Sequence, residues 1–124
     1  MAKILAVDDQ RTIRELVSVV LKAQGHQIDT AEDGLKALQL AKENKYDLII
    51  SDVNMPNMNG ISFVGKVRKL LHLKYVPILM LTTESSDGIK ASARNSGASG
   101  WLTKPFDSRR LSGAVKKMLA KQES

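Results

Sequence analysis

The sequence lacks cysteine and holds few aromatic residues, and each shortage excludes a class of protein. Without cysteine the chain can form no disulfide bond and no thiolate metal site. One Trp, two Tyr and two Phe, with no block of five consecutive basic residues, cannot build the stacking platform of a single-strand nucleic-acid binder. No apolar run approaches the roughly 18 residues of a membrane helix. We therefore expect no membrane and no nucleic acid as partner.

The charge balance is basic, with 19 Lys and Arg against 13 Asp and Glu, a net charge of +6. A nucleic-acid interface would explain this balance, but solvated helix faces rich in Lys and Arg explain it as well, and we favour them. The N-terminal segment "MAKILAVDD" has no signal-peptide anatomy, because a strand-like segment meets acids at once. A length of 124 residues corresponds to one domain, 1–124, which we expect to be monomeric and cytoplasmic.

Two hydrophobic periods alternate along the chain. Short apolar or alternating runs predict five strands, at residues 3–7, 26–31, 46–51, 76–81 and 99–103. Apolar residues at helical spacing predict five helices, around residues 13–21, 35–41, 61–71, 86–96 and 111–119. Strands that alternate with helices form a parallel sheet with helices on both faces. The sequence therefore predicts the α/β class.

Strand composition also indicates the strand order. The segments 3–7, 46–51 and 76–81 are continuous apolar runs, which is typical of strands buried on both faces. The segments 26–31 and 99–103 are shorter or more polar, as expected of strands at the edges. The doubly wound, flavodoxin-like order 2-1-3-4-5 places these two segments at the edges of a five-stranded sheet.

Polar residues follow four of the predicted strands. They are Asp8, Asp9, Asp52, Thr82, Thr83 and Lys104. In a sheet of this order, ligands bind outside the carboxyl ends of the strands, where the order reverses. A single Asp after a strand is more often a helix cap or a turn residue. The convergence of all six residues on one edge is the stronger signal of a site.

Three carboxylates at one edge cannot all be ionised without a compensating charge. A hard divalent cation resolves the conflict, and oxygen ligands without sulfur suit Mg²⁺. Because Mg²⁺ usually binds one or two carboxylates together with phosphate oxygens, the site favours a phosphoryl group. Lys104 and Thr82 can contact phosphoryl oxygens. Asp52 ends the most central strand and is the best candidate for a nucleophile that forms an aspartyl phosphate.

These residues resemble the receiver domains of two-component signalling, and the resemblance extends over the whole chain. The matching segments are "VDD" at 7–9, "SDVNMPNMNG" at 51–60, "MLTTES" at 80–85 and "KPF" at 104–106. Since no effector domain accompanies them, the chain is similar to the stand-alone chemotaxis regulators of the CheY type. The resemblance implies a response regulator that catalyses its own phosphoryl transfer and dephosphorylation, not an enzyme that turns over an external substrate.

The resemblance implies a role for each acid of the site. Asp52 accepts a phosphoryl group from a histidine kinase of the CheA type, with Mg²⁺ as cofactor. Asp9, Asp52 and the main-chain carbonyl of Asn54 bind Mg²⁺, and Asp8 assists through water. Asn54 and Glu84 stand at the two positions that tune self-dephosphorylation in this family.

The resemblance also implies a switch. Lys104, joined to Pro105 by a cis peptide bond, contacts the phosphoryl group, and Thr82 moves inward to hydrogen-bond it. Trp101 occupies the place of the switch aromatic residue, which turns from exposed to buried. The surface of the fourth helix, the fifth strand and the fifth helix then changes and binds a flagellar motor switch protein, with a phosphatase as a further partner.

Other functions are left open or set aside on particular residues. Within the receiver family, a phosphorelay intermediate or a phosphate sink in a non-motor pathway is the alternative to a motor signal. A haloacid dehalogenase phosphatase needs a second acid two residues after its nucleophile, where this chain has Asn54. A dinucleotide-binding enzyme needs a Gly-rich turn after the first strand, and "DDQRT" holds no glycine. A DNA-binding regulator needs a further module.

Overall fold

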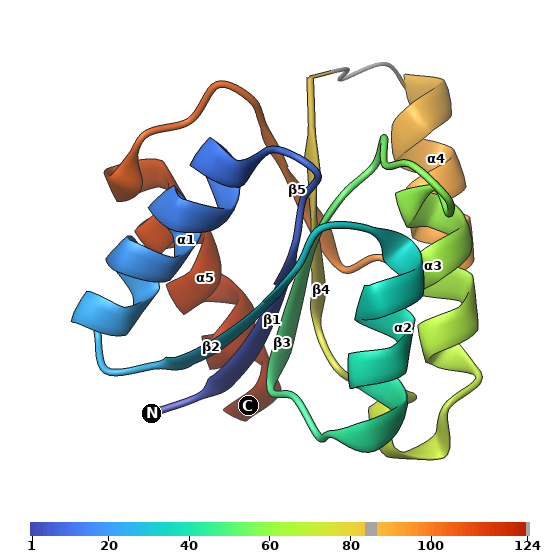
Figure 1. Ribbon diagram of the computed structural model, residues 1–124, viewed down its shortest axis with the longest axis horizontal. Helices are drawn as coiled ribbons and strands as arrows, with labels where there is room; N and C mark the ends of the chain where they lie inside the picture. The colour runs from blue at the N-terminus through green and yellow to red at the C-terminus, as the bar shows by residue number, and fades with distance from the viewer. Residues whose placement is uncertain (84–86, 124) are drawn as a thin grey trace.

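Five parallel strands form one sheet in the order β2-β1-β3-β4-β5, as predicted. The computed structural model describes the main chain of residues 1–83 and 87–123, and the side chains as far as Ala120. The strands are β1 (Lys3–Val7), β2 (Gln27–Ala31), β3 (Leu48–Asp52), β4 (Ile78–Thr82) and β5 (Gly100–Thr103). Their carboxyl ends lie together at the top of Figure 1, so residues that follow the strands meet at one edge.

Five helices cover the sheet, two on one face and three on the other (Figure 1). The helices are α1 (Arg11–Ala23), α2 (Gly34–Glu43), α3 (Gly60–Arg68), α4 (Asp87–Ser96) and α5 (Ser108–Glu123), and a short 3₁₀ turn follows α3 at Leu71–Leu73. Helices α1 and α5 pack against one face, and α2, α3 and α4 pack against the other. No helix in the described part of the chain is long and apolar enough to span a membrane.

The hydrophobic core has two layers because successive side chains of a strand point to opposite faces. In β1, Ile4 and Ala6 join the layer under α1 and α5, and Leu5 joins the layer under α2 to α4. Every residue of β3 and β4 is buried, whereas β2 and β5 are partly exposed. The composition of the strands therefore reported their position in the sheet correctly.

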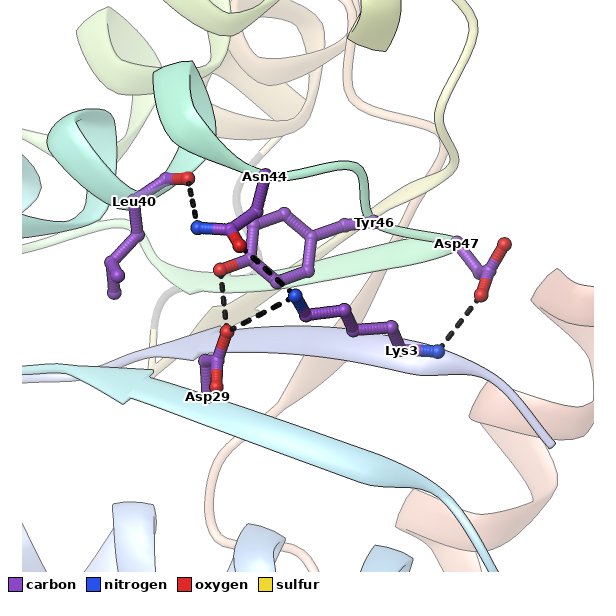
Figure 2. Close-up of polar contacts among 6 residues, drawn as sticks. All are labelled: Lys3, Asp29, Leu40, Asn44, Tyr46 and Asp47. Atoms are coloured by element: carbon purple, nitrogen blue, oxygen red, sulfur yellow. Dashed lines mark hydrogen bonds and ion pairs between the residues drawn. The ribbon is translucent and has the colours of Figure 1, made fainter.

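The strand bounds differ from the prediction by up to two residues. The third strand begins at Leu48 rather than at residue 46, and it includes Asp52. Tyr46 lies before this strand, and its hydroxyl donates a hydrogen bond of 2.7 Å to Asp29 on β2 (Figure 2). Lys3 Nζ donates to Asn44 at 3.0 Å and lies 4.0 Å from Asp29. This network ties β1, β2 and the start of β3 together, at the end of the sheet opposite the carboxyl ends.

Candidate functional site

Three carboxylates meet at the carboxyl edge of the sheet. Asp8 follows β1, and Asp52 is the last residue of the neighbouring strand β3, where Val7 is paired with Ser51. One oxygen from each of Asp8, Asp9 and Asp52 lies within 4.8 Å of the others. Asp8 and Asp52 are only 2% and 5% exposed, whereas Asp9 is exposed. The structure therefore brings together the three acids that the sequence singled out.

Lys104 supplies the positive charge of the site. It follows β5, its bond to Pro105 is cis, as the resemblance implied, and its main-chain N–H donates to the Thr82 carbonyl at 2.8 Å. Its Nζ lies 2.8 Å from Asp8 Oδ2 and 3.3 Å from Asp52 Oδ2. One ammonium thus contacts two of the three carboxylates, and the cluster keeps an excess of negative charge.

Both oxygen atoms of the Asp8 carboxylate have a partner. Its Oδ1 accepts a hydrogen bond of 2.9 Å from the main-chain N–H of Gln10, and its carbonyl accepts one of 2.9 Å from Arg14. Its buried Oδ2 faces the Lys104 ammonium at 2.8 Å, which is the distance of a charge-assisted hydrogen bond. The three carboxylates still outnumber the one ammonium, and a hard cation fits both this excess of negative charge and the set of oxygen atoms.

The ionisation of Asp52 reflects this crowding. Burial, and then the charge of Asp8, raise the pKa of Asp52 to about 6, although Lys104 and the main-chain N–H of Asn54 act in the opposite direction. Burial opposes the charge on Lys104, but its contacts with Asp8 and Asp52 outweigh burial and raise the pKa of the ammonium. Lys104 therefore stays protonated at neutral pH, whereas ionising Asp52 costs free energy in the folded protein.

Thr82 and Trp101 lie on β4 and β5, the two strands that follow β3 in the sheet. Thr82 ends β4, is 2% exposed and is paired with Thr103, the residue before Lys104. Trp101 is half-buried on β5 with its register partner at Met80, so the structure does not bring it into the carboxylate cluster. Two cations of α4 face its indole ring, Lys90 Nζ at 5.0 Å and the Arg94 guanidinium carbon at 5.3 Å from the ring centre.

The loop from β3 to α3 passes close to Asp52. A Cβ atom at Gly60 would overlap the Asp52 carbonyl oxygen, so only glycine fits there. The N–H of Gly60 donates to the Val53 carbonyl at 2.7 Å, which closes the loop at its base. The exposed Asn54 stands next to this base, with its main-chain N–H directed at the Asp52 carboxylate. Glu84, the second residue expected to tune dephosphorylation, lies outside the described residues.

One contact that bears on this loop has no clear signal in the sequence. Asn57 donates a hydrogen bond of 3.2 Å from Nδ2 to Asp33 Oδ2, at the start of α2. Asn57 has a left-handed main chain with φ of 69°, which Asn tolerates better than most residues. The signal that was available is the Asp-Gly pair at 33–34 before an apolar helix, which is typical of a helix cap.

Comparison with known proteins identifies the family. The sequence model described as "Response regulator receiver domain" matches residues 4–116. The chain belongs to this family. A solved receiver structure, the Vibrio cholerae chemotaxis protein CheY4, is 48% identical and superposes with a TM-score of 0.93 over 96% of this chain and 99% of its own. The flavodoxin-like fold and the family resemblance are thereby confirmed.

Other receiver domains that resemble this chain belong to different kinds of protein. The transcriptional regulatory protein CpxR homolog of Haemophilus influenzae is 38% identical over 100% of this chain, which spans only about half of that protein, 53%. The receiver domain of the sensor histidine kinase PA1611 from Pseudomonas aeruginosa is 25% identical, with a TM-score of 0.88 over 96% of this chain and 98% of its own. That structure holds a magnesium ion coordinated in its active-site cleft.

Proposed function

We propose that this receiver domain is phosphorylated on Asp52 by a histidine kinase, in a reaction that depends on Mg²⁺. The observation that supports this most directly is the meeting of Asp8, Asp9 and Asp52 with Lys104 at one edge of the sheet. In the transfer step, a carboxylate oxygen of Asp52 attacks the phosphorus of a phosphohistidine. The new P–O bond forms as the P–N bond breaks, and the imidazole leaves with the electron pair and takes up a proton.

The ionised form of Asp52 is the nucleophile. With a pKa of about 6, the carboxylate is about nine-tenths ionised at pH 7. Its position at the end of a fully buried strand holds it in one orientation, so little entropy is lost in reaching the donor. Lys104 donates hydrogen bonds to the phosphoryl oxygens and keeps its proton, since its pKa is raised.

The residues present fit a magnesium ion. Asp8, Asp9, Asp52 and the main-chain carbonyl of Asn54 would hold it, and all of them supply the oxygen atoms that Mg²⁺ prefers. When bound, the ion supplies positive charge against the developing charge of the transferred phosphoryl group. The structural support for this assignment is the set of three carboxylate oxygens within 4.8 Å of one another, which the single ammonium of Lys104 does not neutralise.

The output is a change in the surface of α4, β5 and α5. We assign Thr82 and Trp101 to the switch, because Thr82 is buried at the end of β4 and Trp101 links β5 to two cations of α4. Asn54 and Glu84 tune self-dephosphorylation in this proposal. The likeness to a chemotaxis protein of Vibrio cholerae supports a kinase of the CheA type, a flagellar motor switch target and a phosphatase as partners.

A second candidate is a receiver that acts away from the motor, as a phosphorelay intermediate or a phosphate sink. The observation in its favour is the receiver of a sensor histidine kinase from Pseudomonas aeruginosa, which shares the fold over 96% of this chain. A pull-down from a lysate with the phosphorylated and the unphosphorylated protein separates the two. Phosphorylation-dependent capture of a motor switch protein supports the first candidate, and capture of a histidine-phosphotransfer protein supports the second.

Phosphorylation itself is tested by mass spectrometry after treatment with acetyl phosphate and Mg²⁺. We expect a hydroxylamine-labile phosphoryl adduct on Asp52 that is absent when EDTA replaces Mg²⁺. The Asp52→Asn variant serves as the control. An adduct on another residue, or none in the wild-type protein, would falsify the proposed function.

A further inference from the structure

The β3–α3 loop, residues 53–59, holds the main chain of Asn54 in place through its two ends. At the base, the N–H of Val53 donates to the Leu81 carbonyl at 3.0 Å, and the N–H of Gly60 donates to the Val53 carbonyl at 2.7 Å. Residue 54 follows this base directly. The orientation of its carbonyl is set by its own N–H bond to Asp52, by Met55, which packs against the core, and by what holds the far side of the loop.

The far side of the loop is held by the start of α2. Asp33 is the N-cap of that helix, and its Oδ1 accepts a hydrogen bond of 2.9 Å from the N–H of Lys36. Its Oδ2 accepts one of 3.2 Å from the Asn57 side chain. Asp33 is 9% exposed, and its hydrogen bonds, led by that from Lys36, lower its pKa. The Asp33 carboxylate thus caps α2 through Oδ1 and accepts a hydrogen bond from the loop through Oδ2.

Gly34, the residue after Asp33, adds a steric contact to the hydrogen bond between Asp33 and Asn57. A Cβ atom at Gly34 would lie 2.7 Å from Met58 Cβ and 2.9 Å from the Met58 carbonyl oxygen. The first turn of α2 therefore packs directly on the loop one residue beyond Asn57. Only residues 54–56 remain between the two held regions, and one of them is Pro56, whose ring fixes φ.

We infer that Asp33 and Asn57 are positioning residues for magnesium binding: their contact holds the loop so that the main chain of Asn54 faces Asp52. This inference rests on the proposed function, because it names two further residues on which the proposed magnesium site depends. It differs from a purely structural role for Asp33, since capping α2 requires only Oδ1 and would leave magnesium affinity unchanged.

The test uses four single variants, and the double variant of Asp33→Ser with Asn57→Gly, to separate the loop contact from the helix cap and from charge. Asp33→Ser keeps a good N-cap but cannot reach Asn57, and Asn57→Gly keeps the left-handed main chain but removes the amide. Asp33→Asn removes the charge but keeps the length and the cap, and its Nδ2 can donate to Asn57 Oδ1 once the Asn57 amide has turned over. Tyr46→Phe deletes a hydrogen bond at the opposite end of the sheet (Figure 2) and is the matched control.

Mg²⁺ affinity is measured by calorimetric titration with magnesium chloride, and stability by urea unfolding in EDTA. We expect Asp33→Ser and Asn57→Gly each to weaken Mg²⁺ binding about tenfold, as substitutions behind metal ligands do. The double variant should bind no more weakly than either one, because both remove the same contact. Asp33→Asn should stay within about twofold of the wild type, because a partly screened charge has a small effect. Tyr46→Phe should lose stability but not affinity.

The amide resonance of Asn54 gives a spectroscopic readout that a helix cap would not move. In a ¹⁵N spectrum, its shift on adding Mg²⁺ should be reduced in Asn57→Gly and retained in Tyr46→Phe. Wild-type affinity in Asp33→Ser and Asn57→Gly would overturn the inference while leaving the proposed function intact. Equal losses in Asp33→Asn and Asp33→Ser would also overturn it, since charge alone would then explain the effect. Absence of Mg²⁺ binding in the wild type would overturn both.

Discussion

Replacing Asp52 by Asn should make the magnesium-free protein more stable near neutral pH. Asp52 is 5% exposed beside the charge of Asp8, and its pKa is raised from 3.8 to about 6. A carboxyl whose pKa is raised in the folded state binds its proton more tightly there than in the unfolded chain. The wild-type protein therefore loses stability as the pH rises from about 4 to about 6. The amide of the variant does not ionise and avoids this loss.

The size of the effect follows from the shift. About two pKa units, at about 1.4 kcal/mol each, give an upper value of about 3 kcal/mol above pH 6. The attraction between Asp52 and Lys104, whose Nζ lies 3.3 Å from Asp52 Oδ2, lowers this pKa and is therefore already included in the shift. We expect Asp52→Asn to raise the free energy of unfolding by about 1–3 kcal/mol at pH 7.

Urea unfolding in EDTA at pH values from 4 to 8 measures this difference. The two proteins should have similar stability near pH 4, should diverge up to about pH 6 and should run parallel above it. Glu15→Gln is the control, because it removes an exposed acid paired with Arg11 and should change stability by only a few tenths of a kcal/mol. Saturating Mg²⁺ should stabilise the wild type more than the variant, since binding to the native state alone raises stability. A variant less stable than the wild type at pH 7 in EDTA would refute the electrostatic reasoning.

Three further outcomes test other parts of the structure. Gly60→Ala should destabilise the protein by at least about 2 kcal/mol in urea unfolding, because its Cβ would overlap main chain, whereas Gly113→Ala, in open space on α5, should stabilise it by about 0.5–1 kcal/mol. Burial and the N-terminal charge lower the pKa of His26, so protonation of the unfolded chain should reduce the melting temperature as the pH falls below about 6.5. His26→Gln should remove that slope, and an unchanged slope would show that His26 is not its source. Trp101 fluorescence should change on adding Mg²⁺ and acetyl phosphate, and the same change in Asp52→Asn would contradict the assigned switch.

The strand order and the acidic cluster could be predicted because both depend on local patterns. Continuous apolar runs identify the buried strands, and the rule that ligands bind at the carboxyl edge of such a sheet predicts that Asp8 and Asp52 meet, as they do in the structure. The start of the third strand was wrong by two residues, because the apolar ring of Tyr46 was counted with the strand. In the structure its hydroxyl pairs with Asp29, a contact between segments 17 residues apart.

The contact of Asp33 with Asn57 could not be predicted for the same reason. The two residues are 24 positions apart, and each has a sufficient local explanation, Asp33 as a helix cap and Asn57 as a residue that tolerates a left-handed main chain. Their meeting depends on how closely α2 packs on the loop, which is set by the absence of a side chain at Gly34. Local patterns thus predict which residues gather in the acidic cluster, whereas a contact such as that of Asp33 with Asn57 emerges only from packing.

The charge balance of the site explains why the binding of a metal ion and the binding of a phosphoryl group should depend on each other. Three carboxylates and one ammonium leave about two negative charges when Asp52 is ionised. Without a cation, an anionic phosphoryl donor is repelled by the negative charge of this cluster. A bound cation reduces that charge and also relieves the repulsion among the three carboxylates. Because coupling between two ligands is reciprocal, a bound cation strengthens the binding of the phosphoryl group by the same factor as the phosphoryl group strengthens the binding of the cation. A loop contact that orients a single main-chain ligand can therefore affect the binding of both the magnesium ion and the phosphoryl group.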